Sequence, residues 1–183
     1  MAKNQNRSIL KLVLLMPMLF TAGILFAQKS AKDSKLITES TEAKAKFIAA
    51  DGQMQSLFSN AYAYVIFPNV GKGAIGVGGA AGNGIVFQGG KAIGKASMKQ
   101  VTVGFQWGGQ AYREVIFLEN KETLDRFQQD KVEFSAQASA VAATKGASGN
   151  VKYANGVMIF TQAKGGLMYE ASVGGQKFKY TPF

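Results

Sequence analysis

The sequence predicts an α+β domain in which N-terminal helices pack on a curved, glycine-rich, largely antiparallel sheet. Apolar residues recur at helical spacing over 30–60, and β-forming stretches separated by glycines follow. One short helical stretch near residues 120–129 interrupts the strands. Helices at one end of a chain followed by a run of strands are typical of an α+β domain.

Residues 1–27 have the layout of a secretory signal peptide. Lys3, Arg7 and Lys11 form a positively charged start, and an apolar run from Leu12 to Ala27 follows. The run is shorter than the roughly 20 residues of a spanning helix, so a retained anchor is the weaker alternative. We therefore expect cleavage after Ala27 and export to the periplasm or cell envelope. The expected organisation is a leader over 1–27, a helical segment over 28–49 and one domain over 50–183.

The segment 30–60 carries one apolar stripe with helical periodicity. Asp33 or Ser34 is a suitable cap for its start. Gly52 is expected to divide it into two consecutive helices, because glycine costs about 1 kcal/mol relative to alanine inside a helix. The stripe consists of Leu36, Ala43, Phe47, Ala50, Met54, Leu57 and Phe58.

From Tyr62 onward the pattern changes to that of strands. AYAYVIF predicts a buried strand that ends in a turn at Pro68 and Asn69. Of the 22 glycines, 13 lie between Gly71 and Gly109, where they alternate with short stretches such as GIVFQ and YREVIFL. Glycines in this pattern permit tight turns, bulges and close backbone approach.

After residue 119 the sequence predicts a short helix and then strands. Asn120 is the expected cap of NKETLDRFQQ. Asn155-Gly156 and Gly165-Gly166 are hairpin-type turn signals, and the strands around MIF and LMYEAS are expected to pair. A cluster of acidic residues mixed with basic ones predicts an exposed, salt-bridged helical face. Its acidic members are Glu114, Glu119, Glu122, Asp125, Asp130 and Glu133.

Catalysis is disfavoured by composition. The chain has no histidine and no cysteine, which removes the commonest proton-transfer group, the usual metal ligands, disulfides and a lipoprotein anchor. A GxGxxG string at 71–76 precedes VGGAAGNG, a poor helix former, and residues 89–96 resemble a phosphate-binding loop but end in Ala96. Both are interpreted as chance matches, so we expect no enzyme activity, no cofactor and no metal.

The charge distribution points to an anionic partner. The net charge is +10, and no acidic residue lies between Asp51 and Glu114. Export argues against nucleic acid, which leaves anionic phospholipid or another acidic envelope surface. The candidate binding residues are Lys72, Lys91, Lys95, Lys99 and Arg113. A second basic stretch contains Lys145, Lys152, Lys164, Lys177 and Lys179.

Trp107 is the aromatic residue considered as an interfacial anchor, because it lies between Gln106 and Gly108 at the expected end of a strand. The alternative for Trp107 is a core position.

Several motifs together resemble the SYLF domain of lipid-binding proteins over residues 50–183. They are Ile66-Phe67-Pro68 followed by GVGG at 76–79, GFQWGGQ at 104–110, and a late GGLMYEAS segment. The resemblance implies a non-enzymatic module that binds acidic phospholipids. Members often have Gly-Ala-Asp-Ala and Gly-Pro where this chain has SAQA at 135–138 and ATK at 143–145.

The function expected from the charge pattern and the resemblance is peripheral binding of acidic phospholipid headgroups by an exported protein. Glycine-turn amides supplement the basic side chains, since free backbone N–H groups can bind phosphate oxygens. The alternative is an envelope interaction protein that recognises another protein or an acidic polysaccharide.

Overall fold

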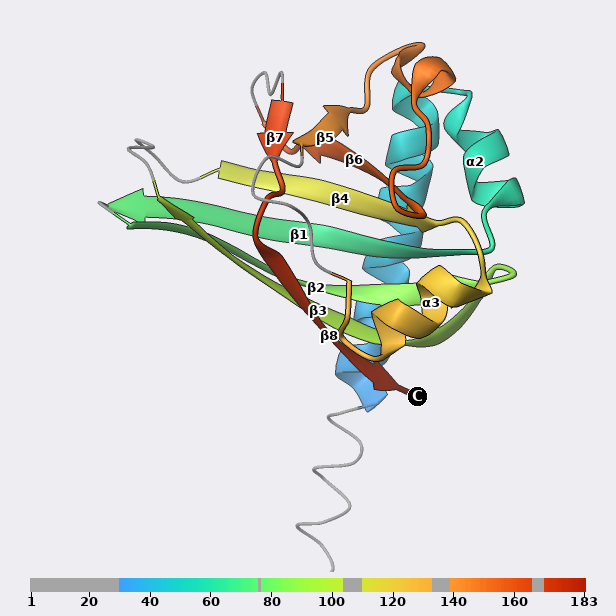
Figure 1. The fold of residues 1–183 in the computed structure, drawn as a ribbon, viewed down its shortest axis with the longest axis horizontal. Helices are drawn as coiled ribbons and strands as arrows, with labels where there is room; N and C mark the ends of the chain where they lie inside the picture. Colours follow the sequence, from blue (N-terminus) through green and yellow to red (C-terminus); the bar gives the residue numbers. More distant parts are fainter. Residues whose placement is uncertain (1–29, 76, 104–109, 133–138, 166–169) are drawn as a thin grey trace, which may run out of the picture. The chain divides into compact units, whose positions relative to one another are not determined.

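The computed structural model describes residues 30–75, 77–103, 110–132, 139–165 and 170–183. Residues Leu36–Phe183 form one compact unit, to which the following account applies (Figure 1). The predicted leader lies outside the described residues. Among the helices that are described, none is both long enough and apolar enough to cross a bilayer.

The helices occur where the sequence predicts them, but the first one begins before Asp33 and Ser34, so neither residue is its cap. An N-terminal helix covers residues 30–50, and α2 follows as Met54–Asn60. The break between them contains Gly52, as expected. Helix α3 (Lys121–Gln128) is the short helix predicted between the strands, and η1 (Ala147–Asn150) is a single 3-10 turn.

The strands form one mixed sheet with the order β7-β5-β6-β4-β1-β2-β3-β8. Only the β5–β6 pair is parallel among the described pairings. The α+β class and the largely antiparallel pairing are therefore confirmed, whereas the curvature of the sheet stays a prediction. The bounds are β1 Ala63–Ile75, β2 Val77–Gln88, β3 Lys91–Val103, β4 Gln110–Leu118, β5 Ser139–Ala142, β6 Val157–Ala163, β7 Glu170–Ser172 and β8 Gln176–Pro182.

The expected turn at Pro68 and Asn69 is wrong, because β1 continues through both residues. The pairing of β1 shifts register between Ile66 and Asn69 toward β2, and between Phe67 and Val70 toward β4. Proline has no N–H to donate to a ladder and is found in strands at such irregularities. The bulge therefore accommodates Pro68 without ending the strand.

The expected pairing of the two late strands is also wrong. Strand β5 lies between β6 and β7 and pairs with both. A hairpin reading misses this arrangement, since it considers only strands that are consecutive in the chain. The turn at Asn155-Gly156 is confirmed, with φ of 53° and 81° at its two residues. Gly166 of the second predicted turn lies outside the described residues.

The glycine pairs have two different roles. Gly89-Gly90 joins β2 to β3 with φ of 55° and 77°, which fits a tight hairpin turn. Gly78-Gly79, in contrast, lies inside β2 rather than in a turn. Close backbone approach is clearest at Gly84, where an added Cβ would lie 2.4 Å from the carbonyl oxygen of Ile66.

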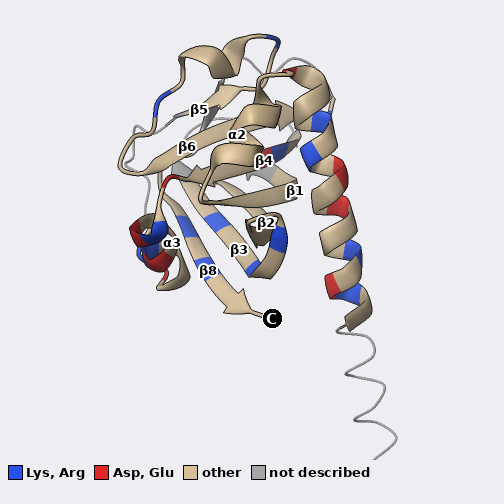
Figure 2. Ribbon diagram, turned by 90° about the vertical axis from the view of Figure 1, so that its right-hand side faces the viewer, with Lys and Arg blue, Asp and Glu red and all other residues tan. Residues whose placement is uncertain are grey.

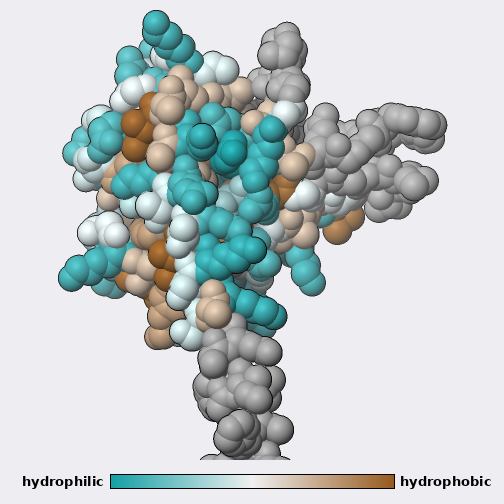
Figure 3. All heavy atoms as spheres, turned by 180° about the vertical axis from the view of Figure 1, so that it is seen from behind, coloured by the Kyte–Doolittle hydropathy of each residue, from teal (hydrophilic) through white to brown (hydrophobic). Residues whose placement is uncertain are grey.

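Each face of the sheet has its own apolar core. On one face, here called the helix face, the N-terminal helix and α2 pack against the sheet through Phe47, Met54 and Phe58. On the other, called the α3 face, Leu124 and Phe127 of α3 join the core. The apolar stripe predicted over 30–60 is therefore turned toward the sheet. Seen from behind, the surface is mostly hydrophilic, with small and scattered apolar areas (Figure 3).

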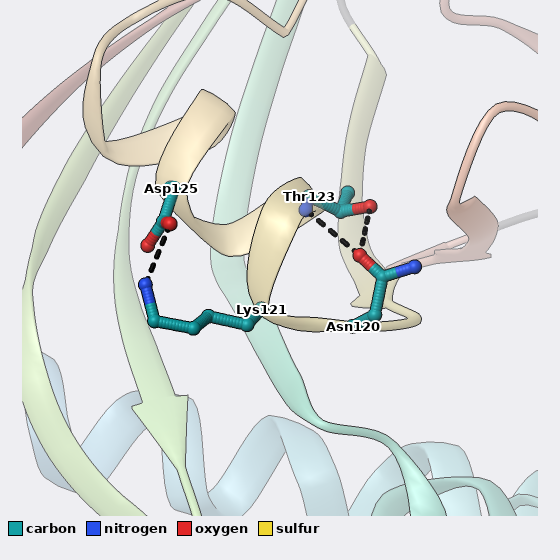
Figure 4. A network of polar contacts seen from close by, with 4 residues as sticks. All are labelled: Asn120, Lys121, Thr123 and Asp125. Carbon is teal, nitrogen blue, oxygen red and sulfur yellow. Dashed lines mark hydrogen bonds and ion pairs between the residues drawn. The ribbon is translucent and has the colours of Figure 1, made fainter.

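Helix α3 begins at a complete side-chain cap. Asn120 Oδ1 accepts hydrogen bonds from the Thr123 backbone N–H at 3.0 Å and from its hydroxyl at 3.1 Å (Figure 4). Lys121 and Asp125 form an exposed ion pair at 2.7 Å on the same helix. Just beyond α3, Asp130 Oδ1 accepts the backbone N–H of Tyr180 at 2.8 Å, which ties this end of α3 to β8.

Candidate anion-binding site

Four lysines on β3 and β8 form a basic row that we call the lysine ladder: Lys95, Lys99, Lys177 and Lys179. Lys99 lies directly opposite Lys177 in the antiparallel register, and Lys179 lies opposite Ser97. Figure 2 shows these basic positions as blue bands on neighbouring strands, and neither strand contains an acidic residue. Lys99, Lys177 and Lys179 are exposed, and Lys95 is half-buried.

The ladder lies on the helix face of the sheet. Lys95 is the register partner of Ile85, which belongs to the core on that face. Side chains two residues apart in a strand share a face, so Lys99 lies on the same side as Lys95. The intervening Ala96 and Met98 belong to the core of the α3 face. The ladder therefore shares the helix face with the apolar core, and it lies in the solvent-exposed part of that face on β3 and the edge strand β8.

The ladder has an electrostatic cost in the folded protein. Opposed residues of an antiparallel pair have Cβ atoms about 5 Å apart, and like charges at that spacing destabilise the sheet. Lys99 and Lys177 are such a pair. A bound anion relieves their repulsion, so the geometry favours anion binding at this place.

The bulge at the start of β3 separates Lys91 from the other predicted lysines. Ala92 pairs with Phe87 and packs on the helix face, whereas the next ladder step pairs Gly94 with Val86. Alternation therefore turns Lys91 toward the α3 face, away from Lys95 and Lys99. A four-residue spacing in the sequence suggests one face for all three, because it assumes an unbroken strand.

The remaining predicted residues lie elsewhere. Arg113 is on β4, which is separated from β3 by β1 and β2. Lys72 is on β1, but its side chain is not among those that the structure describes. Trp107 lies outside the described residues, so its anchor role stays a prediction. The structure thus brings together only Lys95 and Lys99 among the predicted residues whose side chains it describes.

The sequence alone places Lys177 and Lys179 in a separate basic stretch, whereas in the structure they complete the ladder. Their alternation in QKFKY indicates one face of a strand. The pairing of β8 with β3 could not be read from that pattern, because the two strands are far apart in the chain.

A pocket of about 290 Å³ lies on the same face, between the N-terminal helix and the sheet, and we call it the charged pocket. It contains Arg113 together with two other cationic side chains and two carboxylates. Its lining residues are Glu39, Glu42, Ala43, Lys46, Pro68, Asn69, Arg113 and Lys164. In contrast to the ladder, it presents charges of both signs.

Glu114 does not belong to an exposed helical face, so that part of the prediction is wrong. It lies on β4 and is fully buried. Its Oε2 accepts a hydrogen bond from Gln176 Nε2 of β8 at 2.9 Å, and burial raises the pKa of Glu114 to about 7. The reason is topology: β4 extends to Leu118, and the charged helix begins only at Lys121. The Lys121–Asp125 pair confirms the salt-bridged face on α3 itself.

Candidate metal ligands are considered within the part of the chain that the structure describes. No group of three or more histidine, cysteine, aspartate or glutamate residues is placed there to hold an ion.

Comparison with known proteins finds a family match in the C-terminal part of the chain. Residues 99–180 match the model of the Ysc84 family, described as "Las17-binding protein actin regulator". A curated relative, "Beta cell expansion factor A" of Aeromonas veronii, is 26% identical over 155 residues. The alignment covers 82% of this chain and 58% of that protein, so the chain spans less than two thirds of its relative.

Proposed function

Since the match over residues 99–180 confirms the resemblance to the SYLF (Ysc84) family, we propose that this protein binds acidic phospholipid headgroups through the lysine ladder. The binding is peripheral, reversible and non-catalytic. Three of the four ladder residues, Lys99, Lys177 and Lys179, lie within the matched segment. A sequence without histidine or cysteine supports a binding protein rather than an enzyme.

The observation that carries the proposal is the directly opposed Lys99–Lys177 pair. Two exposed ammonium groups held side by side form a binding place for phosphate oxygens, and Lys95 and Lys179 extend it along both strands. Each lysine near an acidic membrane contributes about 1 kcal/mol, so the ladder as a whole supplies roughly 4 kcal/mol. That magnitude suits reversible attachment.

The proposed place of action is the cell envelope, reached after export. This part rests on the predicted leader over residues 1–27. Of the basic residues predicted from the sequence, Lys95 and Lys99 keep their role in the proposal. Lys91 is assigned none, because the β3 bulge turns it toward the other face.

The test is co-sedimentation of the purified protein with liposomes. Neutral phosphatidylcholine is compared with mixtures that contain phosphatidylglycerol or cardiolipin, at low and at physiological salt. We expect binding to require the acidic lipid. The double variant Lys99→Glu/Lys177→Glu should weaken it by at least about 30-fold, the equivalent of losing two lysine contributions.

The matched control is Lys145→Glu/Lys152→Glu, which makes the same charge change at two exposed positions outside the ladder. Equal losses in both double variants would assign the effect to net charge and reject the ladder. An absence of binding to every mixture would reject the lipid proposal. A protein partner, as the family description suggests, or an acidic polysaccharide would then be the leading alternative.

A further inference from the structure

The charged pocket is lined by the N-terminal helix and by three neighbouring strands of the sheet. Glu39, Glu42 and Lys46 come from the N-terminal helix, Arg113 comes from β4, and Lys164 follows the end of β6. Pro68 and Asn69 of the β1 bulge also line it. The bulge that interrupts the β1 ladder therefore contributes to the wall of a pocket.

One hydrogen-bonded chain connects the helix to the sheet through Asn69. Lys164 Nζ donates to Asn69 Oδ1. Asn69 Nδ2 donates to Glu39 Oε2 at 3.3 Å. The amide of Asn69 thus holds a cation from the β6 end and a carboxylate from the helix in fixed relative positions.

A second chain runs through Gln162. Arg113 donates from one terminal nitrogen to Gln162 Oε1 at 3.2 Å. Gln162 Nε2 donates to the backbone carbonyl of Lys46 at 3.3 Å. Arg113 is half-buried, and this bond goes to a neutral amide rather than to a pocket carboxylate. A guanidinium has five N–H donors, so donors remain for a ligand.

The charge pattern selects a class of ligand. Three cations, Lys46, Arg113 and Lys164, share the pocket with two carboxylates. A bare anion would match only the three basic groups, and a metal cation only the two carboxylates. A ligand with a phosphate at one end and an ammonium at the other satisfies both sets. Arginine is suited to the phosphate end, because its planar donors match phosphate oxygens in pairs.

We propose that the charged pocket binds a phosphoethanolamine group, with its phosphate at Arg113 and Lys164 and its primary ammonium at Glu42 and Glu39. Its volume, about 290 Å³, lies at the lower end of ligand pockets, which suits a headgroup better than a larger molecule. The group can come from the headgroup of phosphatidylethanolamine or from the free compound. This site is separate from the lysine ladder and does not depend on its function.

The first experiment is a calorimetric titration of the purified protein with O-phosphoethanolamine, phosphocholine and inorganic phosphate. We expect saturable binding of O-phosphoethanolamine, at least tenfold tighter than that of inorganic phosphate. Phosphocholine should bind more weakly, because a quaternary ammonium cannot donate hydrogen bonds to the carboxylates. Equal binding of all three compounds, or no binding of O-phosphoethanolamine, would overturn the proposal.

Two variants locate the two ends of the ligand. Arg113→Gln should weaken every phosphate compound at least tenfold, while Glu42→Gln should remove the preference for O-phosphoethanolamine over phosphate. Thermal melts confirm that each variant is folded. The ladder variant Lys99→Glu/Lys177→Glu should bind O-phosphoethanolamine as the unchanged protein does. Unaltered binding in both Arg113→Gln and Glu42→Gln would show that the ligand occupies another place.

The final arm distinguishes the two sources of the group. The ladder variant is floated with phosphatidylcholine vesicles with and without phosphatidylethanolamine. Binding that requires phosphatidylethanolamine and is competed by O-phosphoethanolamine assigns the lipid headgroup. Binding of the soluble compound without binding of these vesicles assigns the free compound. Both results support the pocket chemistry, whereas vesicle binding that O-phosphoethanolamine does not compete contradicts it.

Discussion

Among the described residues two carboxylates are buried, and their surroundings move their pKa values in opposite directions. Asp51, after the N-terminal helix, accepts from the Ser148 hydroxyl at 2.7 Å, the Ser148 backbone N–H at 2.9 Å and the Gln53 backbone N–H at 3.1 Å. The hydrogen bonds from Ser148 hold the pKa of Asp51 below its usual 3.8. Glu114 accepts from Gln176, and burial raises its pKa to about 7.

The difference reflects the balance between hydrogen-bond donors and desolvation: the donors outweigh burial at Asp51, whereas burial outweighs the single donor at Glu114. Asp51 has three donors from two segments and stays ionised. Glu114 Oε1 has no partner among the described residues, so its charged form is poorly solvated. The first carboxylate stabilises the fold through its charge, whereas the second destabilises it whenever it ionises.

Removal of the Asp51 side chain should have the largest effect. Asp51→Ala leaves the buried amide and hydroxyl of Ser148 without an acceptor, at roughly 2 kcal/mol each. We expect the free energy of unfolding at pH 7 to fall by about 4 kcal/mol in urea denaturation. Asp125→Ala, which removes only an exposed ion-pair partner, is the control and should cost less than about 1 kcal/mol. Similar losses in both variants would contradict the role of the Ser148 contacts.

Glu114 should make stability fall as the pH rises. Its folded pKa of about 7 lies above its unfolded value near 4.5. Its contribution to the free energy of unfolding is therefore fully present below pH 4.5 and is lost as the pH rises through 7. The loss is on the order of 3 kcal/mol. In Glu114→Gln this slope should disappear, measured as the free energy of unfolding from pH 4.5 to 8. The exposed Glu119→Gln should keep the slope, and a slope in Glu114→Gln would assign it to another group.

Weakening the donors of Asp51 should have an intermediate effect. Ser148→Ala removes the hydroxyl but keeps the backbone N–H, and we expect a loss of about 2 kcal/mol at pH 7. The stability from Asp51 is present above the unfolded pKa and is lost as the pH falls through the lower folded pKa. With one donor fewer, the folded pKa rises, so acid unfolding should begin at higher pH. An unchanged acid transition, followed by circular dichroism, would argue against this account.

Removal of the Asn120 side chain, a neutral acceptor of two hydrogen bonds, should lower the free energy of unfolding least. Asn120 accepts two hydrogen bonds from Thr123 as Asp51 does from Ser148, but without a charge. Asn120→Ala should therefore cost about 1 kcal/mol, independent of pH between 4 and 8. Asn120→Asp serves as the comparison and should retain stability at pH 7 through the helix dipole. A pH-dependent loss of stability in Asn120→Ala would contradict this comparison of an uncharged acceptor with the charged Asp51.

Local features of this fold were predictable from the sequence. The helix break at Gly52, the Asn120 cap and the Asn155-Gly156 turn each depend on neighbours within a few residues. The continuation of β1 through Pro68 depends instead on a register shift against two partner strands. The insertion of β5 between β6 and β7 likewise depends on pairing between distant segments.

The candidate site likewise contains features that local sequence predicts and features that depend on pairing between distant segments. Lys95 and Lys99 could be identified from their own spacing, while their partnership with Lys177 required the β3–β8 register. The separation of Lys91 follows from one extra residue in β3, which no hydrophobic pattern indicates. The buried Glu114 has its hydrogen-bond donor in Gln176, which is 62 positions away. Interactions of that range are set by topology.

The contact between Asp130 and the backbone of Tyr180 has a consequence for self-association. Strand β8 is the last strand of the sheet, and the bond to Asp130 occupies one of its outward N–H groups. An edge strand with free N–H and C=O groups is a template on which further chains can add. Here a side chain occupies part of that template, and Lys177 and Lys179 repel an identical strand. The same edge that offers positive charge to an anion therefore discourages growth into fibres.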